Sequence, residues 1–370
     1  APAITWARQG VTLNPFIAYT LDLLRPILAL TEQARSLFKP GGLDLGKGDV
    51  FVNHELAAFM ETLSQEGDRA FYEGETAERI AEDMRQAGGM VTAEDLARYR
   101  VIERRPLRLR YRDAELFTNP PPSFGGALIA LSLELLEAGE GSGLEFGSPR
   151  HLLRLAAVME EVDRLRDGEY LEIEGEPERL SMLAAGVARL RKATRGTTHV
   201  SVCDGEGNAA SMTTSNGEGS GYVVPGTGII LNNMMGEDDL HPRGFHSSTP
   251  GLRISSMMSP SVLVREDGTV MALGSGGSKR IRTAILQVLC NVIDFKMPLP
   301  EAVAAPRMHH NEGRFELEPG FDSTSLETIE GRWPVNVWAE KNMYFGGVHA
   351  VTSAGEVAGD HRRGGSAQRV

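Results

Sequence analysis

Cysteine is scarce in this chain, which has only Cys203 and Cys290 among 370 residues. Two cysteines cannot build the disulfide framework of a small secreted scaffold, and both lie in apolar runs, so we expect buried free thiols. The chain also lacks an apolar run of about 18 residues, the length that a membrane-spanning helix needs. The sequence therefore predicts a core-stabilised globular protein with no membrane span.

Long runs of one charge sign are missing too. The chain carries 38 basic and 50 acidic side chains, which give a formal net charge of −12. Because nucleic acids and anionic lipids are attracted to a basic face, we expect neither as a partner. An initiator methionine and a signal-peptide pattern are also missing from the start at Ala1. We therefore expect further residues upstream, and the sequence assigns no compartment.

Hydrophobic periodicity changes character near residue 196. Residues 1–196 are mostly of helical pattern, and strand-like alternation begins at Thr197. The helices that we expect cover residues 77–84, 93–100, 126–137, 149–166, 178–192, 281–295 and 299–305. The strands that we expect lie within residues 104–118, 200–202, 209–214, 229–231, 261–265 and 269–273. Helices, then hairpins, then helices favour stacked layers with antiparallel sheets inside.

The run Gly196-Thr197-Thr198-His199 suggests a nucleophile that is made by self-cleavage. If the peptide bond before Thr197 breaks, one residue gains both a hydroxyl and a free α-amine. An α-amine has a reference pKa of roughly 7.7–8.0 and can take the proton of the hydroxyl beside it. Without the motifs around it, Thr197 would be an ordinary strand residue.

Ordered motifs along the chain resemble those of the γ-glutamyltranspeptidase family. In the second half these are TTHVSV at 197–202, CDGEGNAAS at 203–211, GIILNN at 228–233, ISSMMSP at 254–260, GSGGSKRI at 274–281 and APRMHH at 305–310. In the first half they are APAITWARQG at 1–10, FYEGETAERIAEDM at 71–84, GGMVTAEDLARY at 88–99 and NPPPSFGG at 119–126. Any one motif is weak, but their common order extends over nearly the whole chain.

The resemblance implies an α+β fold, the four-layer αββα sandwich of N-terminal-nucleophile hydrolases. It also implies cleavage between Gly196 and Thr197, so that 1–196 becomes part of a large subunit and 197–370 a small subunit. The two subunits would form a heterodimer within one αββα domain. The implied activity is transfer or hydrolysis of γ-glutamyl groups from glutathione or a similar amide, without a cofactor.

Four residues are implied as catalytic. Thr197 is the expected nucleophile, and Ser215 stands where the family has a threonine that bonds the nucleophile's oxygen. Gly276 and Gly277 match the Gly-Gly pair whose backbone N–H groups bind the oxyanion. This chain lacks the family's proline before that pair, so a register that uses Gly277 and Ser278 stays open.

Three residues are implied to bind the donor's amino-acid end. Ser255 and Ser256 match a Ser-Ser pair for the α-carboxylate, and Glu237 stands at the position of an aspartate for the α-ammonium. The arginine that assists the serines lies, in the family, upstream of this chain's start. Met234 replaces a family glutamine, which weakens the case for free glutathione as the preferred donor.

Two alternatives stay open. The segment 238–254 is shorter than the lid of well-known members, which predicts an open site for bulkier acyl groups such as glutaryl, cephalosporin-type or polyglutamyl substrates. A relative that is never cleaved would instead act as a binding protein.

Two further patterns are expected to be structural. Residues 41–47 imitate a phosphate loop, but Gly48 takes the Ser/Thr position, so we expect a surface turn. His309-His310 lacks partners at metal-ligand spacing, and we expect packing or hydrogen bonding. The sequence predicts no metal site.

Overall fold

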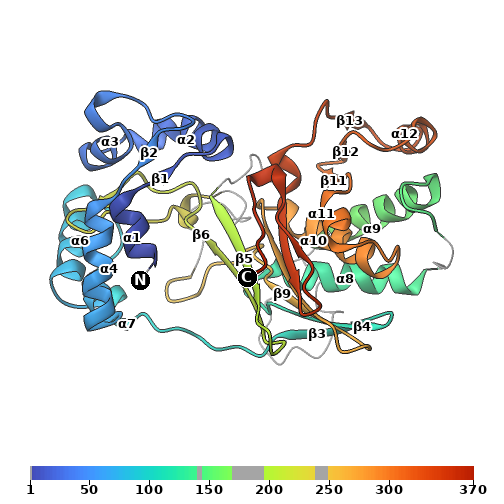
Figure 1. Ribbon diagram of the computed structural model, residues 1–370, viewed down its shortest axis with the longest axis horizontal. Helices are drawn as coiled ribbons and strands as arrows, with labels where there is room; N and C mark the ends of the chain where they lie inside the picture. The colour runs from blue at the N-terminus through green and yellow to red at the C-terminus, as the bar shows by residue number, and fades with distance from the viewer. Residues whose placement is uncertain (1, 140–143, 169–195, 238–248) are drawn as a thin grey trace. The chain divides into compact units, whose positions relative to one another are not determined.

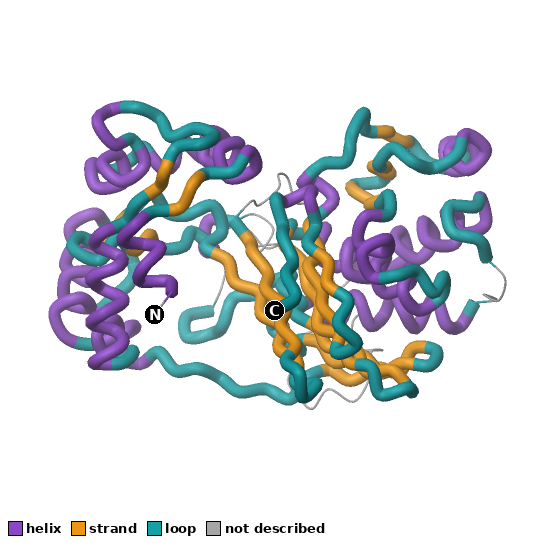
Figure 2. The backbone as a smooth tube through the Cα atoms, viewed as in Figure 1, coloured by secondary structure: helices purple, strands orange, loops and turns teal. Residues whose placement is uncertain are grey.

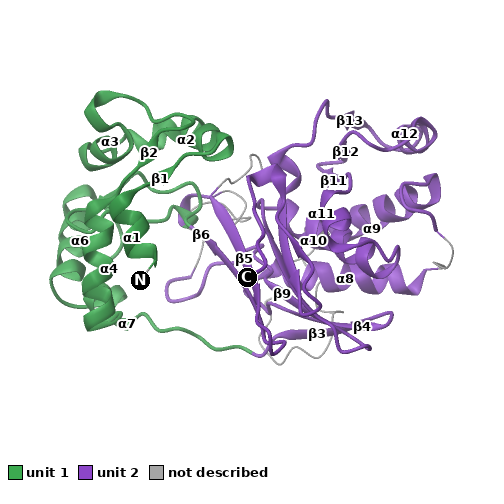
Figure 3. Cartoon of the chain, viewed as in Figure 1, with its two compact units in different colours: residues 1–104, 216–234 green, residues 105–215, 235–370 purple. Residues whose placement is uncertain are grey.

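The structure is a computed structural model that describes residues 2–139, 144–168, 196–237 and 249–370. The chain folds as two compact units, which Figure 3 shows in different colours. Unit 1 contains residues 1–104 and 216–234, and unit 2 contains residues 105–215 and 235–370. The expected subunit boundary at Gly196-Thr197 lies inside unit 2 and stays a prediction.

Unit 1 is mainly helical. Its helices are α1 (Pro2–Gln9), α2 (Pro15–Leu28), α3 (Glu32–Phe38), α4 (His54–Glu66), α5 (Arg69–Tyr72), α6 (Gly74–Ala87) and α7 (Ala93–Arg98). Its short antiparallel pairs are β1 (Val11–Thr12) with β2 (Val50–Phe51), and β7 (Val223–Val224) with β8 (Ile229–Ile230). Gly88 ends α6 in the left-handed region at φ 72°, and Thr92 with Asp95 caps α7, so both helix boundaries are confirmed.

Unit 2 is built around a six-stranded antiparallel sheet in the order β15-β14-β10-β9-β4-β3. The strands are β3 (Leu107–Tyr111), β4 (Ala114–Thr118), β9 (Ser261–Arg265), β10 (Val270–Gly276), β14 (Gly347–Thr352) and β15 (Val357–Ala358). The predicted turn at Arg112 is confirmed, with φ 54° at that residue. The predicted hairpin around Gly268 is confirmed as β9 and β10.

Three helices contact one face of this sheet: α8 (Phe124–Ala138), α10 (Arg280–Ile293) and α11 (Leu299–Ala304), and α9 (Pro149–Gly168) packs against α8. Every residue of α10 is buried, because this helix lies between the sheet and its helical neighbours. A small sheet of β11 (Met308–Asn311), β12 (Arg314–Leu317) and β13 (Val335–Val337), with α12 (Ser323–Glu330), completes this side (Figure 2). The expected helices at 126–137, 149–166, 281–295 and 299–305 are thus confirmed.

A hairpin of β5 (Thr197–Cys203) and β6 (Ala209–Ser215) lies against β10 and β14, on the side of the sheet opposite the helices (Figure 1). Alternate residues of a strand face opposite sides, and here the inward set is polar: Thr197, His199 and Ser201 from β5, and Ser211, Thr213 and Ser215 from β6. Hairpin, sheet and helices form three stacked layers within unit 2, which correspond to the two β layers and one α layer of an αββα sandwich.

A few expectations need correction. The strand at 229–231 is half-buried rather than buried, and its partner β7 is the buried strand of the pair. Cys203 is half-buried at the end of β5, whereas Cys290 is buried as expected, and both thiols are free. The helix expected at 178–192 lies outside the described residues. No described helix is both long and apolar enough to cross a bilayer.

Candidate active site

Thr197 and Ser215 face each other at one end of the β5–β6 hairpin. They are direct cross-strand partners, and the side-chain oxygens Thr197 Oγ1 and Ser215 Oγ are 3.0 Å apart. Either hydroxyl can donate in this hydrogen bond. The structure therefore brings together the expected nucleophile and the hydroxyl expected to orient it.

Gly276, the last residue of β10, approaches Thr197 from the neighbouring sheet. A Cβ atom on Gly276 would lie 2.4 Å from the backbone oxygen of Thr197, closer than real Cβ contacts occur. Gly277 follows at φ 134°, and a Cβ there would lie 2.9 Å from the Cα of Gly346. The Gly-Gly pair is thus required both by space and by backbone conformation.

The turn after β10 leads directly into α10. Gly277, Ser278 and Lys279 connect the last strand residue to Arg280, where the helix begins. The N-terminus of a helix carries a partial positive charge and unpaired N–H groups, which suit an anion. Both registers considered for the oxyanion donors, Gly276 with Gly277 and Gly277 with Ser278, lie where the end of β10 passes into this turn.

His199 lies on the same face of β5 as Thr197 and makes hydrogen bonds that the sequence analysis did not predict. Its ring nitrogens lie 2.8 Å from Thr213 Oγ1 and 2.8 Å from Ser201 Oγ, and the Ser201 hydroxyl donates to the His349 backbone oxygen at 3.2 Å. Burial, with a smaller contribution from His349, lowers the pKa of His199 to about 3, so the ring is neutral near pH 7. The alternation of β5, which turns residues 197, 199 and 201 to one side, was the available signal.

The three expected donor-binding residues also lie in unit 2. Ser256 is held by the start of α8, where its backbone oxygen accepts from Phe124 N at 2.9 Å and its N–H donates to Pro122 at 3.3 Å. Ser255 and Ser256 are half-buried, and Glu237 is buried. Their binding roles stay predictions.

The histidine pair has structural partners. His309 Nδ1 lies 2.9 Å from Thr283 Oγ1, and His310 Nδ1 lies 2.8 Å from Asp163 Oδ2. Among the described residues no group of three His, Cys, Asp or Glu side chains is placed to hold a metal ion. The interpretation of residues 309 and 310 as packing and hydrogen-bonding residues is confirmed.

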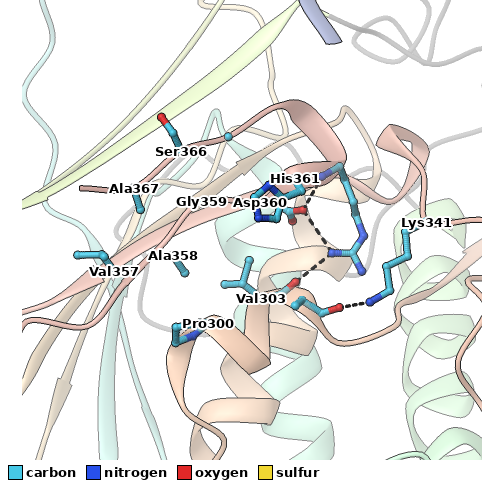
Figure 4. A pocket seen from close by; sticks show the side chains of 13 residues that line it. Pro300, Val303, Lys341, Val357, Ala358, Gly359, Asp360, His361, Ser366 and Ala367 are labelled. Carbon is cyan, nitrogen blue, oxygen red and sulfur yellow. Dashed lines mark hydrogen bonds and ion pairs between the residues drawn. The ribbon is translucent and has the colours of Figure 1, made fainter. Parts of the chain in front are cut away.

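A pocket of about 620 Å³ lies between α11, β15 and residues 359–367 (Figure 4). Apolar side chains such as Val303 and Val357 line it, and at its rim Lys341 Nζ donates to the backbone oxygen of Ala304. The residues expected in the active site are not among those that line this pocket.

The layered fold belongs to the class of N-terminal-nucleophile hydrolases. The chain aligns with the crystal structure of cephalosporin acylase from Bacillus halodurans at a TM-score of 0.82 and 23% identity. That alignment covers 100% of this chain and 73% of the other. Identity this low establishes the fold alone, and the expected fold class is confirmed.

The chain is a member of the gamma-glutamyltranspeptidase family, whose model matches residues 1–370. The glutathione hydrolase proenzyme of Escherichia coli (strain K12) is 31% identical, over 90% of this chain and 64% of its own length. The acylase ACY 1 proenzyme of Pseudomonas sp. (strain SE83) is 34% identical, over 90% of this chain and 63% of its own length. The chain therefore spans less than two thirds of either relative, and the family includes both hydrolases and acylases.

Proposed function

We propose that the chain is cleaved before Thr197 and then uses Thr197 to transfer or hydrolyse γ-glutamyl groups. The observation that carries the proposal is the contact between Thr197 Oγ1 and Ser215 Oγ beside the Gly276 turn. A nucleophile, a hydroxyl that orients it and a glycine turn at a helix start meet at one place. Acyl transfer through an ester needs these parts.

Cleavage begins when Thr197 Oγ1 attacks the carbonyl carbon of Gly196. The C–N bond breaks as the C–O bond forms, the hydroxyl proton passes to the released amine, and Gly196 becomes an ester on Thr197. Water then hydrolyses this ester. The products are a carboxylate on Gly196 and a free α-amine on Thr197.

Turnover repeats this chemistry on the substrate. The α-amine of Thr197 accepts the hydroxyl proton while Oγ1 attacks the γ-carbonyl carbon of the donor. The turn at Gly276 and Gly277 supplies donors to the oxyanion, and loss of one such donor typically costs about 2.7–4 kcal/mol in transition-state stabilisation. The leaving amine takes the proton from the Thr197 ammonium, and water or an amine acceptor releases the acyl group.

Donor recognition follows from the chemistry of the remaining residues. The hydroxyls of Ser255 and Ser256 suit the α-carboxylate of a γ-glutamyl donor such as glutathione, and the carboxylate of Glu237 suits its α-ammonium. The large and small subunits would stay together as a heterodimer.

An acylase for bulkier amides is the second candidate. A relative named acylase ACY 1 is as similar to this chain as one named glutathione hydrolase. Met234 also removes a polar contact expected for glutathione. The open lid expected at 238–254 falls largely outside the described residues.

Mass spectrometry of the purified protein tests the proposal. We expect fragments that meet at Gly196-Thr197, and a γ-glutamyl or glutaryl adduct on the Thr197 fragment after a brief exposure to donor. Release of p-nitroaniline from γ-glutamyl and glutaryl anilides then separates the two candidates. A protein that stays full-length and unmodified would support the binding-protein alternative instead.

A further inference from the structure

The hydroxyl of Ser275 joins the end of β10 to the start of β14. Ser275 Oγ donates to the backbone oxygen of Gly276 at 2.9 Å and accepts from the backbone N–H of Gly347 at 3.1 Å. Ser275 is fully buried, so water does not compete for either hydrogen bond. The hydroxyl thereby fixes the carbonyl group that precedes the expected oxyanion turn.

This contact sets the direction of the peptide unit between Gly276 and Gly277. The Gly276 carbonyl points toward β14, because it accepts from Ser275 and a Cβ on Gly346 would lie 3.2 Å from its oxygen. In a trans peptide the C=O and N–H groups point in opposite directions, so the N–H of Gly277 points away from β14. On that side of β10, the pairing with β9 ends at Leu273, before the turn is reached. This N–H is therefore directed out of the ladder, as a ligand-binding donor must be.

Two consecutive glycines need such an anchor. Gly276 and Gly277 have no Cβ to restrict rotation of the peptide between them, and Gly277 has a φ of 134°, which other residues rarely adopt. Without a partner for its carbonyl, this peptide rotates more freely and turns its N–H in other directions. The hydroxyl of the preceding residue supplies the restraint that the glycines lack.

The strand that receives the hydroxyl is held in place at the same point. Arg307 is buried and donates from Nη1 to the Phe345 backbone oxygen at 3.1 Å. It pairs with the buried Asp360 at 2.7 Å, and the Asp360 carboxylate accepts from the Val348 N–H at 2.9 Å. These two hydrogen bonds lie on either side of Gly347, so its N–H is fixed before a ligand binds.

The space around the hydroxyl is confined. A Cβ on Gly346 would lie 3.0 Å from Ser275 Oγ and 3.0 Å from the Cβ of Ala284 in α10. Gly346 also has a φ of 79°, in the region that favours glycine. A side chain at residue 346 would crowd the hydroxyl, so the turn before β14 accommodates it.

The anchored peptide lies beside the expected nucleophile. A Cβ on Gly276 would lie 2.4 Å from the backbone oxygen of Thr197. Gly277 belongs to both registers considered for the oxyanion donors, and its N–H is the one whose direction the Ser275 contact sets.

We infer that Ser275 is a positioning residue for acyl transfer, which holds the N–H of Gly277 in the direction that binds the oxyanion. The buried hydroxyl acts through the peptide between Gly276 and Gly277 and not on the donor itself. Preorganised donors need no rearrangement as charge develops, so their effect falls on the transition state. This inference rests on the proposed function and adds to it a residue that the sequence analysis did not single out.

Removal of the hydroxyl tests the inference. We expect Ser275→Ala to lower kcat about 10- to 100-fold for the p-nitroanilide that the wild type hydrolyses, γ-glutamyl or glutaryl, because a misdirected donor stabilises the oxyanion less. KM should change by less than about twofold, since this N–H acts in the transition state. Each rate is divided by the fraction of protein that mass spectrometry shows to be cleaved before Thr197.

A tetrahedral inhibitor provides a second measurement. A boronic acid whose boron replaces the reacting carbonyl carbon of the donor forms a tetrahedral adduct with Thr197 Oγ1 and presents an oxygen to the turn. Its inhibition constant should rise in Ser275→Ala by a factor similar to the loss in kcat. Inhibition by the planar acid, glutamate or glutarate, should not change.

Three further variants separate positioning from packing. Ser275→Cys fills a similar space with a weak donor and should lose kcat as the alanine variant does, whereas Ser275→Thr keeps the hydroxyl and should recover most of kcat. Ser261→Ala is the matched control, because Ser261 is also a buried strand serine whose hydroxyl has two hydrogen-bond partners, Thr118 and Ser259. It should lower the melting temperature without lowering kcat.

Unchanged kcat in Ser275→Ala and Ser275→Cys, an equal loss of kcat in Ser261→Ala, or equal weakening of the boronic and planar inhibitors would overturn the inference and assign Ser275 a packing role. Failure of the proposed function gives a different result. In that case the wild-type protein releases no p-nitroaniline from either anilide and forms no adduct on Thr197.

Discussion

His199 and Gly274 meet across the two stacked sheets, where a Cβ on Gly274 would lie 2.3 Å from Cε1 of the imidazole. The ring occupies the space that a side chain on β10 would take. The β5–β6 hairpin, which carries Thr197, therefore packs on the larger sheet through contact of the His199 ring with the backbone of Gly274.

Gly274→Ala should therefore destabilise the protein. Overpacking of a filled interior typically costs about 1–3 kcal/mol, and His199 cannot withdraw without losing its hydrogen bonds to Thr213 and Ser201. Thermal or denaturant unfolding measures the loss. Gly205→Ala is the matched control, because nothing lies within 4 Å of a Cβ at that position. Equal stability of the two variants would contradict the close contact.

Acid should weaken the fold through His199. Its pKa falls from about 6.5 in the unfolded chain to about 3 in the folded one. The unfolded state therefore binds the proton first, and the free energy of unfolding falls as the pH drops below about 6.5, by about 1.4 kcal/mol per pH unit for this one group.

His199→Gln should remove that contribution. The unfolding free energy should then fall less steeply between pH 6 and pH 4, by the slope that corresponds to about one bound proton. His151, with a pKa lowered to about 4 by burial, contributes in the same direction and remains in the variant. A slope that does not change on substitution would show that His199 is already protonated in the folded state.

Ser215→Ala should slow self-cleavage and turnover while leaving the fold intact. It removes the hydroxyl that lies 3.0 Å from Thr197 Oγ1 and leaves the expected nucleophile in place. Ser215→Thr keeps the hydroxyl and should retain activity. We expect the alanine variant to lose about 10-fold or more in kcat with little change in melting temperature, as measured with a γ-glutamyl anilide. Full activity would remove Ser215 from the mechanism.

Glu318→Gln should be strongly destabilising. Glu318 is buried and pairs with the buried Arg362, and removing one partner of such a pair typically costs about 3–5 kcal/mol. The exposed pair of Glu266 with Arg110, at 2.7 Å, is the comparison, and Glu266→Gln should change stability by less than about 1 kcal/mol. Similar losses in both variants would contradict the difference in burial.

Much of the layer order could be predicted from local sequence. Gly88, the capping pair of Thr92 and Asp95 and the turn at Gly268 each act within a few residues, so they fix element ends without tertiary information. The meeting of Thr197 with Ser215 was also within reach, since a short turn joins their strands. The order of the motifs along the chain indicated the family.

Contacts between distant segments were not predictable in the same way. Gly274 and His199 are separated by a long stretch of chain, and the close approach of their strands depends on how two sheets stack. The position of Arg363 could not be predicted, because the glycines beside it, Gly276, Gly277 and Gly347, come from two other segments of the chain. A long-range fit of this kind leaves no periodicity to detect.

The narrow approach of Gly276 to the Thr197 backbone has a consequence for how such a protein can diversify. If this turn first assists cleavage of the chain and later the attack on a donor, a substitution in it affects both reactions. It must then preserve self-cleavage as well as turnover. Variation in substrate range is then confined to side chains that maturation does not use, and the acyl-binding periphery is free to change while the turn is not.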